Sequence, residues 1–383
     1  MAGIFSALPR SVYRDDHLLF QDQVQRFIDN EILPFLPAWE AAGVTPKALW
    51  RQAGAQGLLN CFLPAPYGAG GDFGHAAIVI ETLARANCLG IGFSIHSDMV
   101  APYLWNLGTQ AQKDRWLPAM AQGECIGAIA MTEPGAGSDL KAIRTRATRV
   151  GDDYVLQGQK TFITNGINAD LIIVLASTDP DLGARGMSLF VIEDGMPGLS
   201  KGPALQKIGQ HCQDTCELFF DDLRVPASHV LGQVNAGFQL VMTELAQERL
   251  AIALRAAASA EGMLQAASDF VRERKIFGRR VLDFQNTRFT LADALSRLTM
   301  LRAFLDACLA QHMQGQLDPV TAAMAKLNAT ELQGQILDAL LQLYGGYGYM
   351  AEYGIGRAWT DARALRIFGG SSEILREIIG KEL

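Results

Sequence analysis

Three long helical segments in the C-terminal part of the chain constrain its fold most strongly. Residues 238–274, 284–314 and 319–344 are rich in alanine, leucine and glutamine. Helices of this length bury their apolar stripes best against one another, as a bundle. The sequence therefore predicts a C-terminal four-helix bundle over residues 234–383.

The N-terminal part, up to about residue 123, also has a helical pattern. Near its start, apolar side chains recur at three- and four-residue spacing, at Leu18, Leu19, Val24, Phe27, Ile28 and Ile32. We expect Pro34 and Pro37 to end this first helix, because proline removes a backbone N–H and clashes with the preceding turn. Further predicted helices cover residues 50–59, 76–86 and 109–120.

The pattern changes near residue 126, where short β-like runs replace the helical spacing. Turn residues separate five such runs, over 126–131, 154–156, 171–176, 188–192 and 216–220. This arrangement is typical of a β-sandwich or barrel of roughly 100 residues. The predicted fold class is therefore α+β and mostly α, with an N-terminal helical domain (1–124), a middle β-sandwich or barrel domain (125–233) and the C-terminal bundle (234–383).

Composition and charge exclude several classes of protein. Nearly half of the 383 residues are apolar, which is enough for a sizeable core. The net charge of −7 comes from both signs scattered along the chain, so we expect no nucleic-acid partner, which would favour a basic face. The sequence has no run of about 18 apolar residues, so no membrane span is expected. The first ten residues lack the basic and apolar regions of a signal peptide, and we expect a cytoplasmic protein.

Six cysteines are few for this length, and we interpret them as reduced thiols. They are Cys61, Cys88, Cys125, Cys212, Cys216 and Cys308. His211 beside Cys212 and Cys216 has the residue types of a metal site, but no second ligand pair of suitable spacing lies nearby. We therefore expect no bound metal.

Two segments in the middle of the chain have ligand-binding features. Segment 131–139, Met-Thr-Glu-Pro-Gly-Ala-Gly-Ser-Asp, places two glycines near a hydroxyl, which exposes backbone N–H groups and lets a ligand approach closely. Segment 158–166 adds a second polar turn, where Phe162 can pack against a flat heteroaromatic ring and Thr164 can hydrogen-bond it. The structural alternatives are a tight turn between strands for the first segment and an ordinary strand end for the second.

Three further segments lie in the C-terminal part. Residues 272–278 form a basic cluster at the end of a long helix, which the helix dipole explains, or which can clamp a pyrophosphate. Residues 345–349, Gly-Gly-Tyr-Gly-Tyr, are too rich in glycine to be helical. In residues 368–374 a glycine pair precedes a predicted helix start, and helix N-termini bind anions and oxyanions.

In this order, the five segments resemble the acyl-CoA dehydrogenase family. The resemblance covers almost the whole chain, and five ordered matches are far more specific than any one of them. It implies the three-domain fold predicted above, with FAD bound between the β domain and the bundle. It also implies an acyl-CoA substrate, an electron-transfer flavoprotein as electron acceptor and a homotetramer built as a dimer of dimers.

The same resemblance implies a set of cofactor contacts. Thr132 and the neighbouring backbone would contact the flavin ring, Ser138 would lie near the pyrophosphate, and Phe162 takes a place where the family often has tryptophan. Residues of the adenine half would come partly from a neighbouring subunit. The full set is Ile129, Met131, Thr132, Gly137, Ser138, Phe162, Ile163, Thr164, Arg274, Phe277, Gln285, Gln342, Gly345, Gly346, Ser371 and Glu373.

The position of the catalytic base is where this sequence departs from many family members. They carry a glutamate in the C-terminal segment, at the position occupied here by Gly369. The long-chain and isovaleryl types instead supply a glutamate from the bundle, just before an arginine. Glu248 followed by Arg249 matches that alternative, and the flanking residues look most like the long-chain type. The implied substrate contacts are Ser138, Gln239, Gln247, Arg249 and Gly370.

The expected reaction is the α,β-dehydrogenation of a long-chain or branched acyl-CoA to the trans-2-enoyl-CoA. A desolvated Glu248 carboxylate gains basicity, because burial disfavours its charged form, and would abstract the α-proton while the β-hydride passes to flavin N5. The backbone N–H of Gly369 and a flavin ribityl hydroxyl would stabilise the enolate-like transition state. Chain length depends on a pocket formed partly by residues 93–103.

Several alternatives remain open at this stage. Glu248 can be a surface helix residue paired with a cation, and Glu244, one turn earlier, is the second candidate base. The same architecture serves flavin oxidases and monooxygenases, because fold does not fix function. A protein of another class, a non-catalytic helical interaction protein, is the remaining alternative.

Overall fold

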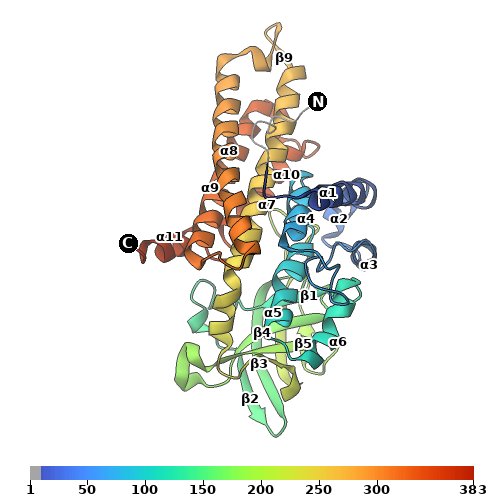
Figure 1. Cartoon of the computed structure of the whole chain (residues 1–383), viewed down its shortest axis with the longest axis vertical. Coiled ribbons are helices and arrows are strands. Elements are labelled where there is room, and N and C mark those ends of the chain that lie inside the picture. Colours follow the sequence, from blue (N-terminus) through green and yellow to red (C-terminus); the bar gives the residue numbers. More distant parts are fainter. Residues whose placement is uncertain (1–9) are drawn as a thin grey trace.

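The computed structural model describes residues 10–383; residues 1–9, which make up most of the segment examined for a signal peptide, lie outside the described residues. Along the sequence, the described chain has an N-terminal helical part, a β domain and a long C-terminal helical bundle, and the β domain lies at the lower end of the molecule in Figure 1. This order confirms the predicted α+β, mostly α fold class.

The N-terminal part is helical, as predicted. Its α-helices are α1 (Asp15–Phe27), α2 (Leu36–Ala42), α3 (Lys47–Ala55), α4 (Phe73–Arg85), α5 (Ala101–Leu107) and α6 (Gln110–Ala121). Two π-helical turns, Ile28–Ile32 and Ile95–Val100, continue α1 and precede α5. Helices α2 and α5 and the turn before α5 were not predicted from the sequence.

Two details of the first predicted helix are wrong. Leu18 and Leu19 are exposed, whereas Val24, Phe27 and the two isoleucines that follow are buried, because α1 packs on α4 along a single narrow face. Pro37 does not end the helix but lies in the first turn of α2. Proline is tolerated there because the first helical N–H groups have no intrahelical acceptor.

The middle domain is one eight-stranded sheet. Its strands are β1 (Gly127–Ala130), β2 (Arg146–Val150), β3 (Asp153–Thr164), β4 (Leu171–Ser177), β5 (Met187–Glu193), β6 (Leu199–Lys201), β7 (Thr215–Pro226) and β8 (Val230–Leu231). They pair in the order β6-β7-β3-β2-β4-β5-β8, with β1 parallel to β4.

The sheet has a hydrophobic core on each of its two faces, and strand β4 contributes side chains to both. Leu171, Ile173 and Leu175 pack with helices α5 and α6 on one face. The alternate residues Ile172 and Val174 pack with β3 and β7 on the other face. Because successive side chains of a strand point to opposite faces, β4 is buried on both sides. The predicted sandwich or barrel is thus a single bent sheet covered by helices.

The first three C-terminal helices match the predicted segments to within about one residue at each end, whereas the two that follow were not predicted with bounds. They are α7 (Gly237–Glu273), α8 (Gln285–Met313), α9 (Pro319–Tyr344), α10 (Gly354–Arg363) and α11 (Ser372–Gly380). The Asp318 side chain accepts N–H bonds at the start of α9, which is a typical N-cap. A small hairpin, β9 (Lys275–Ile276) and β10 (Arg279–Arg280), joins α7 to α8 and was not predicted. We propose the domain limits 124/125 and 233/234, both of which fall in short connections.

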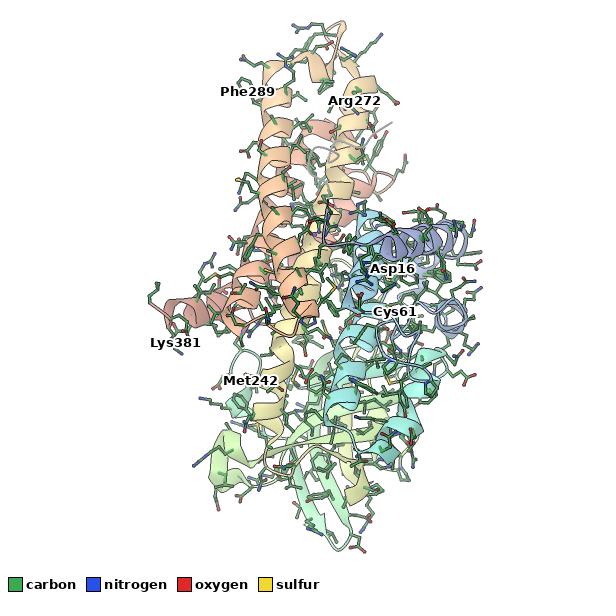
Figure 2. All side chains as sticks on the ribbon, in the orientation of Figure 1. Asp16, Cys61, Met242, Arg272, Phe289 and Lys381 are labelled. Carbon is green, nitrogen blue, oxygen red and sulfur yellow. The ribbon has the colours of Figure 1, made fainter. Side chains whose placement is uncertain are left out.

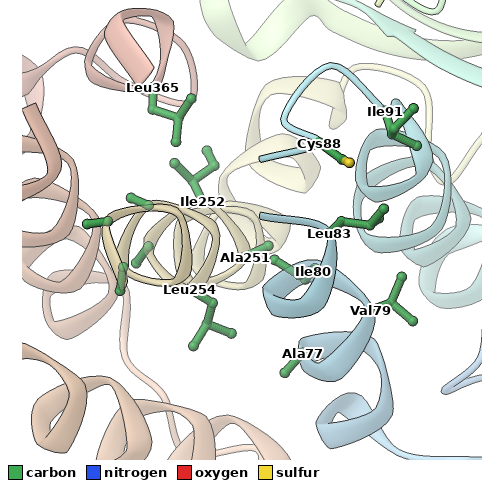
Figure 3. Close-up of a cluster of buried hydrophobic side chains, with 14 of the residues drawn as sticks. Ala77, Val79, Ile80, Leu83, Cys88, Ile91, Ala251, Ile252, Leu254 and Leu365 are labelled. Atoms are coloured by element: carbon green, nitrogen blue, oxygen red, sulfur yellow. The ribbon is translucent and has the colours of Figure 1, made fainter. Parts of the chain in front are cut away.

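One hydrophobic core joins the N-terminal helices to the bundle. It runs from α1, α3 and α4 into α7, α8 and α9. Figure 3 shows its centre, where Ile80 and Leu83 of α4 meet Ala251 and Leu254 of α7. The two helical parts are therefore a single packed unit, with the β domain placed between them along the sequence.

A buried charge cluster crosses the same boundary. Arg302 of α8 donates to Glu81 of α4 at 2.7 Å and to Glu261 of α7 at 2.8 Å. Arg10, before α1, also bonds Glu81. Burial alone would raise the pKa of Glu81, but Arg10 and Arg302 outweigh it and lower that pKa to about 2. Removing one partner of such a cluster leaves a buried charge uncompensated.

Candidate active site

Glu248 lies on α7 and is only 5% exposed. The Tyr103 hydroxyl, from α5, donates to Glu248 Oε1 at 3.1 Å. Burial raises the pKa of Glu248 to about 7; the Tyr103 hydrogen bond opposes this rise, Glu244 adds to it, and Arg249 opposes it. The alternative of a surface glutamate paired with a cation is therefore wrong. A carboxyl with a pKa near neutrality can accept a proton from a weak carbon acid and release it again.

Glu244, the second candidate base, lies one turn earlier on the same helix. The Asn106 amide donates to both of its carboxylate oxygens, at 3.0 and 3.2 Å. Burial raises the pKa of Glu244 and the Asn106 amide opposes that rise. Helix α5 thus supplies one donor to each carboxylate, through Tyr103 and Asn106.

Gly369 lies opposite this stretch of α7. Its φ is +65°, and a Cβ at this position would stand 2.5 Å from Ile252 Cδ1. Ile252 is one turn beyond Glu248, so residue 369 points at the helix that carries Glu248. The two positions considered for the base, 248 and 369, therefore lie on segments of the chain that contact each other at Ile252. Ser371, two residues later, caps α11, with its hydroxyl accepting the Ile374 N–H at 3.5 Å.

The loop 131–139 is fixed to the neighbouring strand β3. The Thr161 N–H donates to the Thr132 carbonyl at 2.9 Å. Lys160, which is fully buried, donates to the Met131 carbonyl and to Glu133, both at 2.9 Å. The structure thus joins the two predicted middle segments. The roles of Lys160 and Glu133 were not predicted, because each lies among other polar residues and glycines in the sequence and has no distinct local signal.

Segment 158–166 was predicted to be a polar turn, with an ordinary strand end as the alternative. The structure shows the alternative, because most of the segment is the second half of β3. A register shift between Lys160 and Ile163 marks a bulge, where Phe162 has a φ of +60° and a side chain that is 68% exposed. A bulge re-aims a side chain, and here it turns the Phe162 ring outward. Ile163, in contrast, is buried in the β-domain core, so only its backbone can contact a ligand.

The residues of this region fit a flavin. Nothing lies within 4 Å of the Cβ positions of Gly135 or Gly137, so the outer side of the loop is open to a ligand. Ser138 is exposed beside them, Ile129 and Thr132 are half-buried, and Thr164 is half-buried at the end of β3. An open glycine loop for phosphate oxygens beside an exposed aromatic ring suits a ring system joined to a pyrophosphate.

The remaining predicted cofactor residues form a second cluster, at the far end of α7. The Arg274 guanidinium lies 4.9 Å from the centre of the Tyr347 ring. Phe277 is 91% exposed at the tip of the β9–β10 hairpin. Gly345 and Gly346 have open space at their Cβ positions. Also exposed are Gln285 and Gln342. The residues 345–349 form a 3-10 helix, which corrects the prediction that they are not helical.

The two clusters do not meet within one chain. Helix α7 has 37 residues, which corresponds to about 55 Å. Met242 lies at the β-domain end of this helix, and Arg272 and Phe289 lie at the opposite end (Figure 2). The flavin-ring residues and the adenine-half residues are therefore separated by most of the length of the molecule. Glu373, on α11, is exposed and belongs to neither cluster.

The predicted substrate residues differ in their exposure and in the hydrogen bonds that they already make within the chain. Gln247 donates to the Asp98 carbonyl at 2.8 Å and bonds His312 at 3.1 Å. Arg249 is buried, and within residues 10–383 its Nε has no hydrogen-bond partner. Gln239 is exposed near the start of α7, as Ser138 is on its loop, and Gly370 is half-buried with a φ of +94°.

A small cavity of about 20 Å³ lies between α4, the turn Ile95–Val100 and α7. Four residues of the predicted pocket segment line it: Phe93, Ser94, Ser97 and Asp98. Burial raises the pKa of Asp98 to about 7. The space is close to that of one water molecule, so an acyl chain needs side chains here to move.

The six cysteines are free thiols, and all but Cys125 are buried. Within the part of the chain that the structure describes, one group of side chains is close enough to share a metal ion: Asp16, His17 and His75. His17 Nε2 already bonds Asp72 at 2.7 Å, and both histidines accept backbone N–H groups at helix starts. Cys212, Cys216 and His211 are not part of this group. No helix among residues 10–383 combines the length and apolarity needed to cross a membrane.

Comparison with known proteins gives a consistent result. Family models match three parts in order: acyl-CoA dehydrogenase N-terminal domain (14–124), middle domain (128–223) and C-terminal domain (235–383). The chain is 46% identical over 377 residues to the mitochondrial long-chain specific acyl-CoA dehydrogenase of Rattus norvegicus, covering 98% of this chain and 88% of the relative.

Two solved structures extend the match to three dimensions. An acyl-CoA dehydrogenase from Geobacillus kaustophilus has a TM-score of 0.95 at 41% identity, covering 97% of this chain and 98% of that one. A glutaryl-CoA dehydrogenase from Mycobacterium smegmatis, in complex with FADH2, has a TM-score of 0.91 at 26% identity, covering 97% and 95%. This protein belongs to the acyl-CoA dehydrogenase family.

Proposed function

We propose that this acyl-CoA dehydrogenase uses Glu248 to take the α-proton of a long-chain or branched acyl-CoA. The family is FAD-dependent, and the chain carries all three of its domains. The observation that carries the proposal is the buried Glu248 carboxyl beside the Gly369 loop, with a pKa raised to about 7.

The chain's own residues prepare the proton transfer. The Cα–H bond breaks toward Glu248, whose carboxylate takes the proton, and the electron pair left on Cα forms the Cα=Cβ bond as the β-hydrogen leaves with its electrons. When bound, FAD supplies the acceptor for that hydride. The Gly369 N–H stabilises the negative charge that develops on the thioester oxygen. Tyr103 holds Glu248 in place through its hydroxyl, and the burial of Glu248 keeps most water from the carboxylate.

Glu248→Gln tests the proposal. The variant should fold and stay yellow with FAD, but anaerobic reduction of its flavin by acyl-CoA should slow by about 10²–10⁴-fold, because general-base help is worth that much. Glu244→Gln, one turn away and also buried, is the matched control and should keep most of the rate. Parental reduction by the Glu248 variant would show the assignment to be wrong.

We also infer an oligomer, because the adenine-half cluster and the flavin-ring cluster lie at opposite ends of α7. A homotetramer in which one subunit's 274–346 region completes a neighbour's FAD site is supported by this separation. An electron-transfer flavoprotein is the proposed electron acceptor and the cytoplasm the proposed location, on the family resemblance. Reduced enzyme should transfer electrons to such a flavoprotein much faster than to oxygen, and a panel of acyl-CoAs should define the preferred chain.

A further inference from the structure

Lys326 on α9 is fully buried, close to the proposed active site. Its ammonium group donates to two backbone carbonyls, that of Phe368 at 2.6 Å and that of Gly370. Burial, with a smaller contribution from the nearby Arg249, lowers the pKa of Lys326 to about 7, and no carboxylate counteracts them. A buried amine without a counter-ion costs stability, so this lysine is not explained as an ion pair of the fold.

The two acceptors lie on either side of one residue. Phe368 and Gly370 flank Gly369, whose N–H is the proposed donor to the thioester carbonyl. Gly369 and Gly370 both have positive φ, +65° and +94°, and two consecutive glycines give a loop with many accessible conformations. Binding both neighbouring carbonyls to one fixed point removes that freedom before substrate arrives.

Ile252 of α7 restricts the position of the same loop from the side opposite Lys326. The missing Cβ of Gly369 would stand 2.5 Å from Ile252 Cδ1 and 3.9 Å from Lys326 Cε. Residue 369 is therefore held between α7, which carries Glu248, and α9, which carries Lys326. One helix supplies the base, and the other fixes the loop opposite it.

We propose that Lys326 is a positioning residue. It holds the Gly369 N–H where it can donate to the thioester carbonyl of the substrate, next to the α-carbon from which Glu248 takes the proton. This inference rests on the proposed function and adds to it the group that pre-organises the oxyanion contact. Electrostatic stabilisation depends on donors that need no rearrangement during the reaction, and a misplacement of about 1 Å can cost about 100-fold in rate.

Lys326→Met tests this inference, since methionine fills similar space but donates no hydrogen bond. Lys201→Met is the matched control: Lys201 Nζ also donates to two backbone carbonyls, of Ile167 at 3.2 Å and Ala169 at 2.6 Å, in the middle domain. Three quantities are measured on each holoenzyme: FAD content, the anaerobic rate of flavin reduction by acyl-CoA with its substrate dependence, and the apparent pKa for enolisation of bound acetoacetyl-CoA.

The enolisation measurement separates positioning from folding. Acetoacetyl-CoA has acidic α-protons, and its bound enolate is stabilised by the same donors as the transition state. In Lys326→Met we expect normal FAD content, a reduction rate lower by about 10- to 100-fold, a nearly unchanged half-saturating substrate concentration, and an enolisation pKa raised by about one unit. Lys201→Met should match the parent in all three.

A Lys326→Met holoenzyme that reduces at the parental rate and enolises the ligand at the parental pKa overturns the inference. If methionine yields too little folded protein, Lys326→Leu, which is smaller and also donates no hydrogen bond, is measured in the same way, and parental values overturn the inference equally. Failure of the parent to reduce its flavin with any acyl-CoA instead refutes the proposed function, while the enolisation pKa still reports on Lys326.

Discussion

At the scale of single residues, Glu248 depends on its surroundings for its chemistry. Burial holds its pKa near 7, and only the deprotonated carboxylate can accept a proton. The rate of flavin reduction should therefore rise between about pH 6 and pH 8, with a midpoint near 7. Anaerobic stopped-flow reduction across this range measures it, and a rate independent of pH over the whole interval contradicts the assignment of Glu248 as base.

Loss of the Tyr103 hydroxyl should shift the pH midpoint of flavin reduction. Its hydroxyl donates to Glu248 and lowers the pKa of the carboxyl, because the hydrogen bond favours the charged form. Tyr103→Phe should therefore move the pH midpoint of reduction upward and slow reduction at pH 7. Tyr67→Phe, which removes a hydroxyl bonded to Asp114 at the surface, is the control and should leave the midpoint in place.

The residues that position the site were not predictable from the sequence. Glu248 and Gly369 were assigned through the family resemblance, which was recognised at the Glu248–Arg249 pair and at the C-terminal glycine pair. Tyr103 reaches Glu248 across 145 positions and Lys326 reaches Gly370 across 44, and such contacts exist only after the chain has folded. From the sequence alone, Lys326 looks like an ordinary solvent-facing lysine. Only the fold shows that it is buried and that two backbone carbonyls accept hydrogen bonds from its ammonium group.

At the scale of secondary-structure elements, α7 and α4 approach closely. A Cβ on Gly262 of α7 would stand 2.2 Å from the carbonyl oxygen of Arg85, at the end of α4. Gly262→Ala should lower the free energy of unfolding by about 1–3 kcal/mol, because the backbone on one side has to shift. Chemical denaturation monitored by circular dichroism measures the change.

Gly334 provides the comparison, because it also lies inside a long helix. A Cβ there would meet only the Arg366 side chain, at 3.8 Å. Gly334→Ala should therefore raise stability by about 0.5–1 kcal/mol, the usual cost of glycine within a helix. Equal effects of the two substitutions would show that helix propensity rather than the α4–α7 contact dominates at Gly262.

Elements were predictable where local pattern and tertiary packing agree. The long bundle helices have continuous apolar faces and clear end signals, such as Asp318 and Pro319, and they were found almost to the residue. The second half of β3 was misread because its glycine, polar and hydroxyl residues are typical of turns, whereas pairing with β7 holds it extended. The β9–β10 hairpin has only two residues in each strand and leaves no periodic trace.

At the scale of the whole molecule, the two halves of the proposed FAD site lie too far apart within one chain to bind the same cofactor, so we expect each site to be completed by a neighbouring subunit. Arg274→Ala should therefore lower FAD content, although Arg274 is almost the length of α7 from the flavin-ring residues. The ratio of flavin to protein absorbance measures this after gel filtration with light scattering. Arg272→Ala, a nearby exposed arginine paired with Asp269, should keep the parental ratio, and an FAD-replete monomer would refute the shared site.

The core shared by the N-terminal helices and the bundle has a consequence for synthesis on the ribosome. Helix α6 ends at Ala121 and α7 begins at Gly237, so 115 residues (122–236) are translated between the two halves of that core. At about 5–20 residues per second this takes about 6–23 s. During that interval the apolar side chains that α1, α3 and α4 turn toward the bundle have no partner, while the β domain can already close. We expect the nascent N-terminal helices to need chaperone protection until the bundle emerges.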